Sequence, residues 1–98
     1  MKKVHVYIIG KVTGVFFRSW TKEQADGRGI HGWIRNVYDR PEIFGKDSGV
    51  EAVFQGEDEK VDQLIELIKV GPPLAGVDDV RSEVEEIDTS LIQFEILK

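Results

Sequence analysis

The chain has 98 residues, of which 41% are apolar, and a formal net charge of −5. That length fits one modest core, so we expect a single domain over residues 1–98. The acidic balance argues against a general nucleic-acid binder or a membrane-surface protein, because both usually display a basic face. No apolar run approaches the ~20 residues of a membrane span. The absence of cysteine excludes disulfides, thiolate nucleophiles and Cys-based zinc sites, and it fits the reducing cytoplasm, where we expect the protein.

The first predicted element is a strand at residues 4–9, which are rich in β-branched side chains and alternate between two faces. We expect one face of this strand to be buried under helices, namely Val4, Val6 and Ile8. Two glycines make residues 10–16 typical of a tight loop. Residues 17–28 favour a helix with a weak apolar stripe, and Gly29 is a natural residue to end it.

The rest of the chain predicts four strands and a second helix, in the order strand 30–38, strand 50–55, helix 57–70, strand 77–86 and strand 91–97. The second helix has the clearest pattern, with apolar residues at i, i+3, i+4 and i+7, namely Val61, Leu64, Ile65 and Ile68. Residues 39–49 contain one proline and two glycines and predict a long hairpin connection. The last strand should place its apolar residues on one face, namely Ile92, Phe94 and Ile96.

The order β-α-β-β-α-β plus a terminal strand predicts an α+β fold of the split βαβ type. Four strands should form an antiparallel sheet with both helices on one face, and a short C-terminal strand should be added to it. The first two strands belong to one βαβ unit and therefore run parallel, with the third strand between them. Their C-terminal ends should lie about 10 Å apart at the same edge of the sheet. This edge gathers the 10–16 loop, Arg18, Arg35 and Asn36.

The loop and Arg18 have the chemistry of an anion site. A loop that leads into a helix presents free N–H groups and a partial positive charge, and a guanidinium in the first turn can bind two phosphate or carboxylate oxygens. An arginine near a helix start is also a common solvated surface residue. On these residues alone, both interpretations remain open. The loop lacks the Gly-x-x-x-x-Gly-Lys-Ser/Thr pattern of a Walker A motif.

Two longer motifs resemble those of a known family. Residues 10–18, Gly-Lys-Val-Thr-Gly-Val-Phe-Phe-Arg, resemble the acylphosphatase signature Gly-[Arg/Lys]-Val-Gln-Gly-Val-x-Phe-Arg. Residues 29–36, Gly-Ile-His-Gly-Trp-Ile-Arg-Asn, resemble the second signature of that family. Further matches at residues 49–53, 55–56 and 71–73 extend the resemblance over nearly the whole chain. The resemblance implies the ferredoxin-like α/β sandwich.

The sequence also departs from the family pattern. Thr13 stands where the family usually has Gln, and Arg28 stands where an apolar helix residue is usual. Residues 40–48 resemble an insertion into the short turn after the second signature. This inserted loop could be a solvated segment without a role. Alternatively, Ile43 and Phe44 could contact the acyl group of a substrate.

The resemblance implies an acylphosphatase, an acylphosphate phosphohydrolase that splits acyl phosphates into a carboxylate and inorganic phosphate. Carried over by position, Arg18 would bind the phosphoryl group and Asn36 would orient the attacking water. The phosphate-binding loop would consist of Thr13, Gly14, Val15, Phe16 and Phe17. No cofactor and no metal are expected. We expect a monomer whose partner is a small-molecule acyl phosphate, with inorganic phosphate or sulfate as a competing anion.

Two other function classes fit parts of the pattern. A catalytically silent ferredoxin-like module for anion binding or regulation would keep the anion pocket without turnover. An RNA-binding module of the same topology would need aromatic residues on its central strands and a basic sheet, which the net charge of −5 speaks against. His5 and His31 are expected to be surface residues, and both tryptophans are expected to pack.

Overall fold

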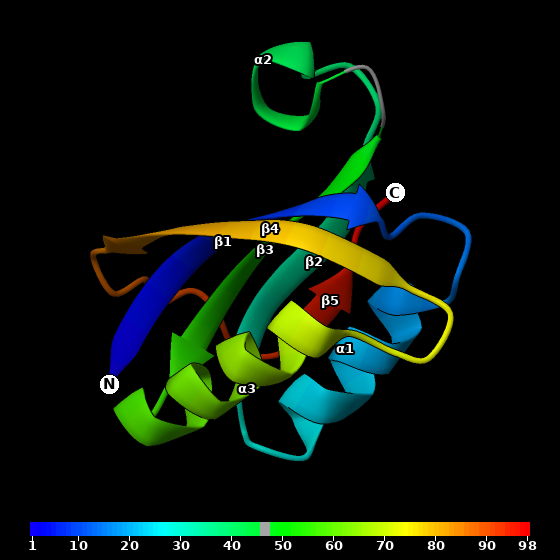
Figure 1. The fold of residues 1–98 in the computed structure, drawn as a ribbon. Coiled ribbons are helices and arrows are strands. Elements are labelled where there is room, and N and C mark those ends of the chain that lie inside the picture. The colour runs from blue at the N-terminus through cyan, green and yellow to red at the C-terminus, as the bar shows by residue number, and fades with distance from the viewer. Residues whose placement is uncertain (46–47) are drawn as a thin grey trace.

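The computed structural model describes residues 1–45 and 48–98. It contains five strands and three helices: β1 (Lys2–Lys11), α1 (Phe17–Asp26), β2 (His31–Val37), α2 (Pro41–Phe44), β3 (Gly49–Gly56), α3 (Asp58–Val70), β4 (Gly76–Glu85) and β5 (Phe94–Ile96). The strands form one sheet in the order β4-β1-β3-β2-β5, and α1 and α3 cover one face of it (Figure 1). This arrangement confirms the predicted α+β ferredoxin-like fold.

The sheet is mixed rather than antiparallel throughout. The β4–β1, β1–β3 and β3–β2 pairs are antiparallel, whereas β5 pairs with β2 in parallel. Because β3 is antiparallel to both of its neighbours, β1 and β2 run in the same direction and end at the same edge of the sheet, as the sequence predicts.

Alternation along the strands buries one face of the sheet against the two long helices. Val6 and Ile8 of β1 and Ile34 of β2 are fully buried on that face. From the helix side, the core receives Phe17, Thr21 and Ala25 of α1 and Val61, Leu64 and Ile68 of α3. The weak stripe of α1 therefore contains a buried threonine. Of the helices that the structure describes, none has the length and apolarity of a membrane span.

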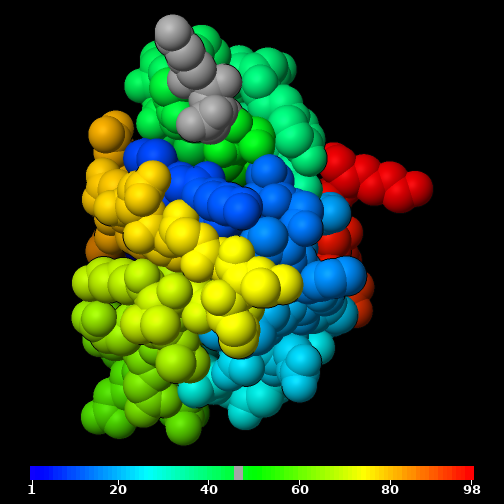
Figure 2. Space-filling model, turned by 45° about the vertical axis from the view of Figure 1, so that its right-hand side comes forward, coloured from blue at the N-terminus to red at the C-terminus, as the bar shows by residue number. Residues whose placement is uncertain are grey.

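Some predicted boundaries are wrong. Helix α1 ends at Asp26 with Gly27 as its C-cap, earlier than Gly29. The last strand is limited to the three residues that pair with β2, so Ile92 lies in the connection before it and is exposed, while Phe94 is buried. The predicted connection between β2 and β3 contains the helical turn α2. This turn lies at one end of the molecule next to β1, with the C-terminal end of the chain extending nearby (Figure 2).

The second signature places Gly32 where the backbone of β3 lies very close to β2. Gly32 has φ +143°, and a Cβ atom there would lie 1.8 Å from the carbonyl oxygen of Val53. We expect Gly32→Ala to lower the free energy of unfolding by at least about 3 kcal/mol, because strain and a backbone clash combine. Urea unfolding followed by circular dichroism measures this loss.

Gly29→Ala is the matched control for this substitution. Gly29 also has positive φ, but no atom lies within 4 Å of its virtual Cβ. Its substitution should cost only the backbone strain, about 1 kcal/mol. Equal losses in the two variants would contradict a role for close β2–β3 contact at Gly32.

Candidate active site

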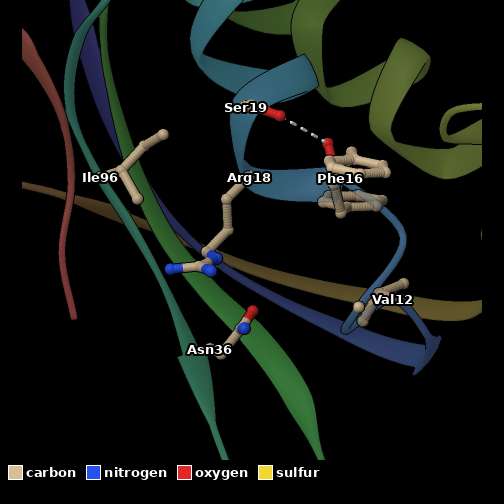
Figure 3. A pocket seen from close by; sticks show the side chains of 8 residues that line it. Val12, Phe16, Arg18, Ser19, Asn36 and Ile96 are labelled. Carbon is tan, nitrogen blue, oxygen red and sulfur yellow. Dashed lines mark hydrogen bonds between the residues drawn. The ribbon is translucent and has the colours of Figure 1, made fainter.

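A pocket of about 260 Å³ lies where β1 and β2 end. It is lined by Val12, Gly14, Phe16, Phe17, Arg18, Ser19, Asn36 and Ile96. Arg18 extends from the start of α1 toward Asn36 at the end of β2 (Figure 3). The volume lies just below the usual range of ligand pockets, so the site suits a small substrate.

The backbone between β1 and α1 is shaped for an anion. Gly14 has φ +71°, and Phe16 is the left-handed N-cap of α1, with φ 61° and ψ 24°. No side chain caps the first N–H groups of the helix, and no acidic residue stands in its first turn. The unmatched donors and the positive end of the helix dipole therefore remain for a ligand.

Arg18 brings a positive charge to these donors. One of its terminal nitrogens donates to the carbonyl oxygen of Leu97 at 3.4 Å. Across residues 1–45 and 48–98, no salt bridge involves Arg18. Its guanidinium is thus held in place and still has donors for an anion.

Asn36 contributes an amide whose two ends differ. Its Nδ2 donates to the hydroxyl of Tyr38 at 3.1 Å. Its Oδ1 is buried and has no hydrogen-bond partner among the described residues. A buried carbonyl oxygen without a donor is costly, and a water molecule or a ligand hydroxyl would satisfy it.

Arg35, the neighbour of Asn36, serves the other face of the sheet. Alternation along β2 turns Arg35 outward, where it binds the buried carboxylate of Glu51 on β3 through Nε at 2.8 Å and a terminal nitrogen at 2.6 Å. His5 on β1 contacts the same carboxylate at 2.6 Å and Glu85 at 3.2 Å. His5 is therefore on the outward face, as predicted, but it belongs to a part-buried network and is not a free surface residue.

The electrostatics of Glu51 follow from this network. Burial alone would raise the pKa of its carboxyl, but the hydrogen bonds from His5 and Arg35 and their charges outweigh burial and hold the pKa below its ordinary value of 4.5. Arg35 is thereby neutralised by Glu51, which leaves Arg18 as the arginine of the pocket.

The structure brings most of the predicted site residues together. Arg18, Asn36, Gly14, Phe16 and Phe17 line the pocket. Thr13 and Val15 do not line it. The sequence did not identify Ser19, Val12 or Ile96 as residues of the site. The apolar alternation of the last strand places Ile96 on an apolar face, and this was the one signal available for it. Among the described residues, no cluster of three or more His, Asp or Glu side chains is placed to hold a metal.

The two loop residues outside the pocket make other contacts. The Thr13 hydroxyl shares a hydrogen bond of 2.9 Å with the Ser48 hydroxyl. Val15 packs against the edge of the core. Both can still contribute backbone to the loop, but their side chains do not face the pocket.

Of the two alternatives for the inserted loop, contact of Ile43 and Phe44 with the acyl group receives no support from the lining of the pocket. Neither residue lines the pocket. Phe44 is buried, with its ring directly over Gly49 and 6.3 Å from the ring of Tyr7. Residues 46–47 of this segment lie outside the described residues.

Comparisons with known proteins agree with the geometry. The family model described as Acylphosphatase matches residues 4–96. An acylphosphatase of Rubrobacter xylanophilus is 42% identical over 95 residues, which cover 97% of this chain and 79% of the relative. An acylphosphatase of Gloeobacter violaceus is 40% identical over 96 residues, which cover 98% of this chain and 94% of the relative. The crystal structure of acylphosphatase from Bacillus subtilis matches with a TM-score of 0.86 and 26% identity over 100% of both chains.

The lowered pKa of Glu51 predicts a pH-dependent stability. The ionised carboxylate stabilises the fold above the unfolded pKa, and this contribution is lost as the pH falls through the lower folded pKa. We expect the free energy of unfolding to fall as the pH is lowered through the ordinary carboxyl pKa of 4.5 and on through the lower folded pKa, and to fall less in Glu51→Gln, which has no carboxylate to protonate. Urea titrations across this range measure both slopes. The same slope in both proteins would show that Glu51 is not the titrating group.

Proposed function

This chain belongs to the acylphosphatase family, and we propose that its pocket hydrolyses the carboxyl–phosphate anhydride bond of acyl phosphates to a carboxylate and inorganic phosphate. The observation that carries the proposal is the meeting of two groups in one pocket. One is the Arg18 guanidinium, without a carboxylate partner among the described residues, and the other is the buried, unpartnered Oδ1 of Asn36.

Arg18 and the loop bind the phosphoryl group. The guanidinium donates to two phosphoryl oxygens, and the N–H groups of the loop and first helical turn donate to the others. Charge on these oxygens is stabilised throughout the transfer by donors that are already in place. Inorganic phosphate or sulfate offers the same oxygens and should compete with the substrate.

Asn36 orients the attacking water. Its Oδ1 accepts a hydrogen bond from the water, while Nδ2 is held by the Tyr38 hydroxyl. The water oxygen then forms a bond to phosphorus as the bond between phosphorus and the acyl oxygen breaks. The acyl oxygen leaves with the electron pair as a stable carboxylate, and a phosphoryl oxygen accepts the proton of the water. No strong side-chain base and no metal are needed for this step.

A catalytically silent anion-binding module is the second candidate. Such a module would use Arg18 and the loop but has no need for the amide of Asn36. The unpartnered Oδ1 beside the anion site favours the enzyme.

We further propose that residues 1–98 act as a single cytoplasmic domain with an inserted segment at 40–48, and as a monomer. The cysteine-free composition supports the compartment.

Arg18→Ala tests the function and the phosphate ligand together. With benzoyl phosphate as substrate, we expect wild-type turnover and a loss of about 10²-fold to 10³-fold in kcat/KM in the variant, because a charge-assisted contact to the transition state is removed. Arg81→Ala, which removes an exposed arginine of β4, is the matched control and should keep wild-type rates. Near-normal kcat/KM in Arg18→Ala would refute its role. No turnover by the wild type would support the silent module.

Asn36→Ala separates catalysis from anion binding. We expect kcat to collapse while the inhibition constant of inorganic phosphate changes little, because the variant loses the water and keeps the phosphate cradle. Asn36→Asp should also fail, since a carboxylate repels the dianionic substrate and cannot make the hydrogen bond that Nδ2 donates to the Tyr38 hydroxyl. Parallel loss of phosphate binding and turnover would instead assign Asn36 to binding or folding.

A further inference from the structure

An exposed aromatic residue stands at the mouth of the pocket. Among the residues that the structure describes, Phe16 is the one non-glycine residue with positive φ, and 81% of it is exposed. Left-handed backbone disfavours bulky side chains, and such outliers cluster at functional sites. Neither packing nor capping explains the ring, because Phe16 makes no side-chain cap.

A groove continues from the pocket past Phe16. Phe16 and Ser19 line both spaces. Of the other residues that line the groove, Glu23 is charged and the rest are apolar, namely Val15, Trp20, Pro72, Pro73 and Leu74. Leu74 is exposed on the far wall. In Figure 2, the yellow segment that contains residues 72–74 lies beside the blue segment of the loop and the start of α1.

The walls of this groove are firmly held. Trp20 and Val15 pack against the core cluster. The turn of the far wall is closed by a hydrogen bond from the N–H of Ala75 to the carbonyl of Pro72 at 3.0 Å, and Pro72 is buried. A preformed apolar wall binds an apolar group without a large ordering cost.

A second groove lies on the other side of the site and is polar. It is lined by Arg35, Asn36, Val37, Tyr38, Asp39, Arg40 and Lys98. It shares Asn36 with the pocket, whereas the apolar groove shares Phe16 and Ser19. In Figure 3, Asn36 lies beyond the tip of the Arg18 side chain, whereas Phe16 lies beside its base.

The direction of phosphoryl transfer distinguishes the two grooves. The attacking and leaving oxygens lie roughly in line on opposite sides of phosphorus. The water is held at Asn36, so the acyl oxygen leaves on the side away from Asn36, toward Phe16 and Ser19. The polar groove is on the side of the water.

We propose that the groove between Phe16 and Leu74 binds the acyl group of the substrate, and that the preferred substrates are acyl phosphates with an apolar or aromatic acyl group. This inference rests on the proposed function, in particular on Asn36 as the water-binding residue. Phe16 and Leu74 are then specificity-determining residues, and they act on the part of the substrate that does not react.

The test compares benzoyl phosphate with acetyl phosphate in Leu74→Ala and Phe16→Asn. Asparagine tolerates the left-handed conformation, so the second variant removes the ring and keeps the backbone. In each variant, we expect the ratio of kcat/KM for benzoyl to that for acetyl phosphate to fall about five-fold to ten-fold, as the phenyl group loses an apolar wall. The inhibition constant of inorganic phosphate should stay at its wild-type value, which shows that the cradle is intact.

Two controls make the outcome decisive. Ile92→Ala removes an equally exposed apolar side chain outside both grooves and should leave the ratio unchanged. Arg40→Ala alters the polar groove and should also leave this ratio unchanged.

An unchanged ratio in both groove variants, with wild-type turnover of benzoyl phosphate, would overturn this inference and leave the proposed function standing. A ratio altered by Arg40→Ala alone would place the acyl group on the water side and also overturn it. Absence of turnover in the wild type would remove the proposed function itself.

Discussion

The antiparallel placement of β3 between β1 and β2 is the constraint on which the site depends. It makes β1 and β2 parallel to each other and brings their C-terminal ends to one edge of the sheet. The loop after β1 then leads into α1 at the point where β2 presents Asn36. Two strand spacings, about 10 Å in all, separate the ends of β1 and β2, and the side chain of Arg18 reaches across this gap toward Asn36. No single segment contains the site.

The buried carboxylate of Glu51 maintains this placement on the opposite face of the sheet. It receives His5 from one neighbouring strand and Arg35 from the other, so one side chain joins all three strands. A slip of one residue would exchange the faces of β2, turning Arg35 toward the pocket and Asn36 away from it. A buried ion pair contributes modest stability, because desolvation offsets much of the attraction. Here it discriminates between strand registers, since the alternative registers leave Glu51 without its partners.

The arrangement of the strands could be predicted from the sequence, because it follows from topological rules. The positions of several side chains could not be predicted. The crossover rule places β1 and β2 in parallel, and the separation of Arg18 from Asn36 follows from it. Phe44 follows Ile43 in an otherwise polar segment without apolar periodicity, so nothing in the pattern predicts that its ring lies over Gly49. The partners of His5 lie 46 and 80 residues away along the chain. The side chains of Thr13 and Val15 do not line the pocket, and the motif does not specify where they point.

The adjacent residues Phe16 and Phe17 show how the loop serves two purposes. Phe17 is 1% exposed in the core, while Phe16 is 81% exposed at the mouth of the pocket. If Phe16 had right-handed helical dihedral angles, it would extend α1 by one residue, and the two rings would have less freedom to point in opposite directions. The left-handed dihedral angles of Phe16 provide that freedom. The same angles leave the carbonyl of Phe16 free to accept the N–H of Trp20 at 3.0 Å and the hydroxyl of Ser19 at 3.1 Å. These bonds offset the strain at Phe16. These bonds do not use the N–H groups of Phe17, Arg18 and Ser19, so the conformation that exposes the ring also leaves donors for the phosphoryl group that we propose is bound here.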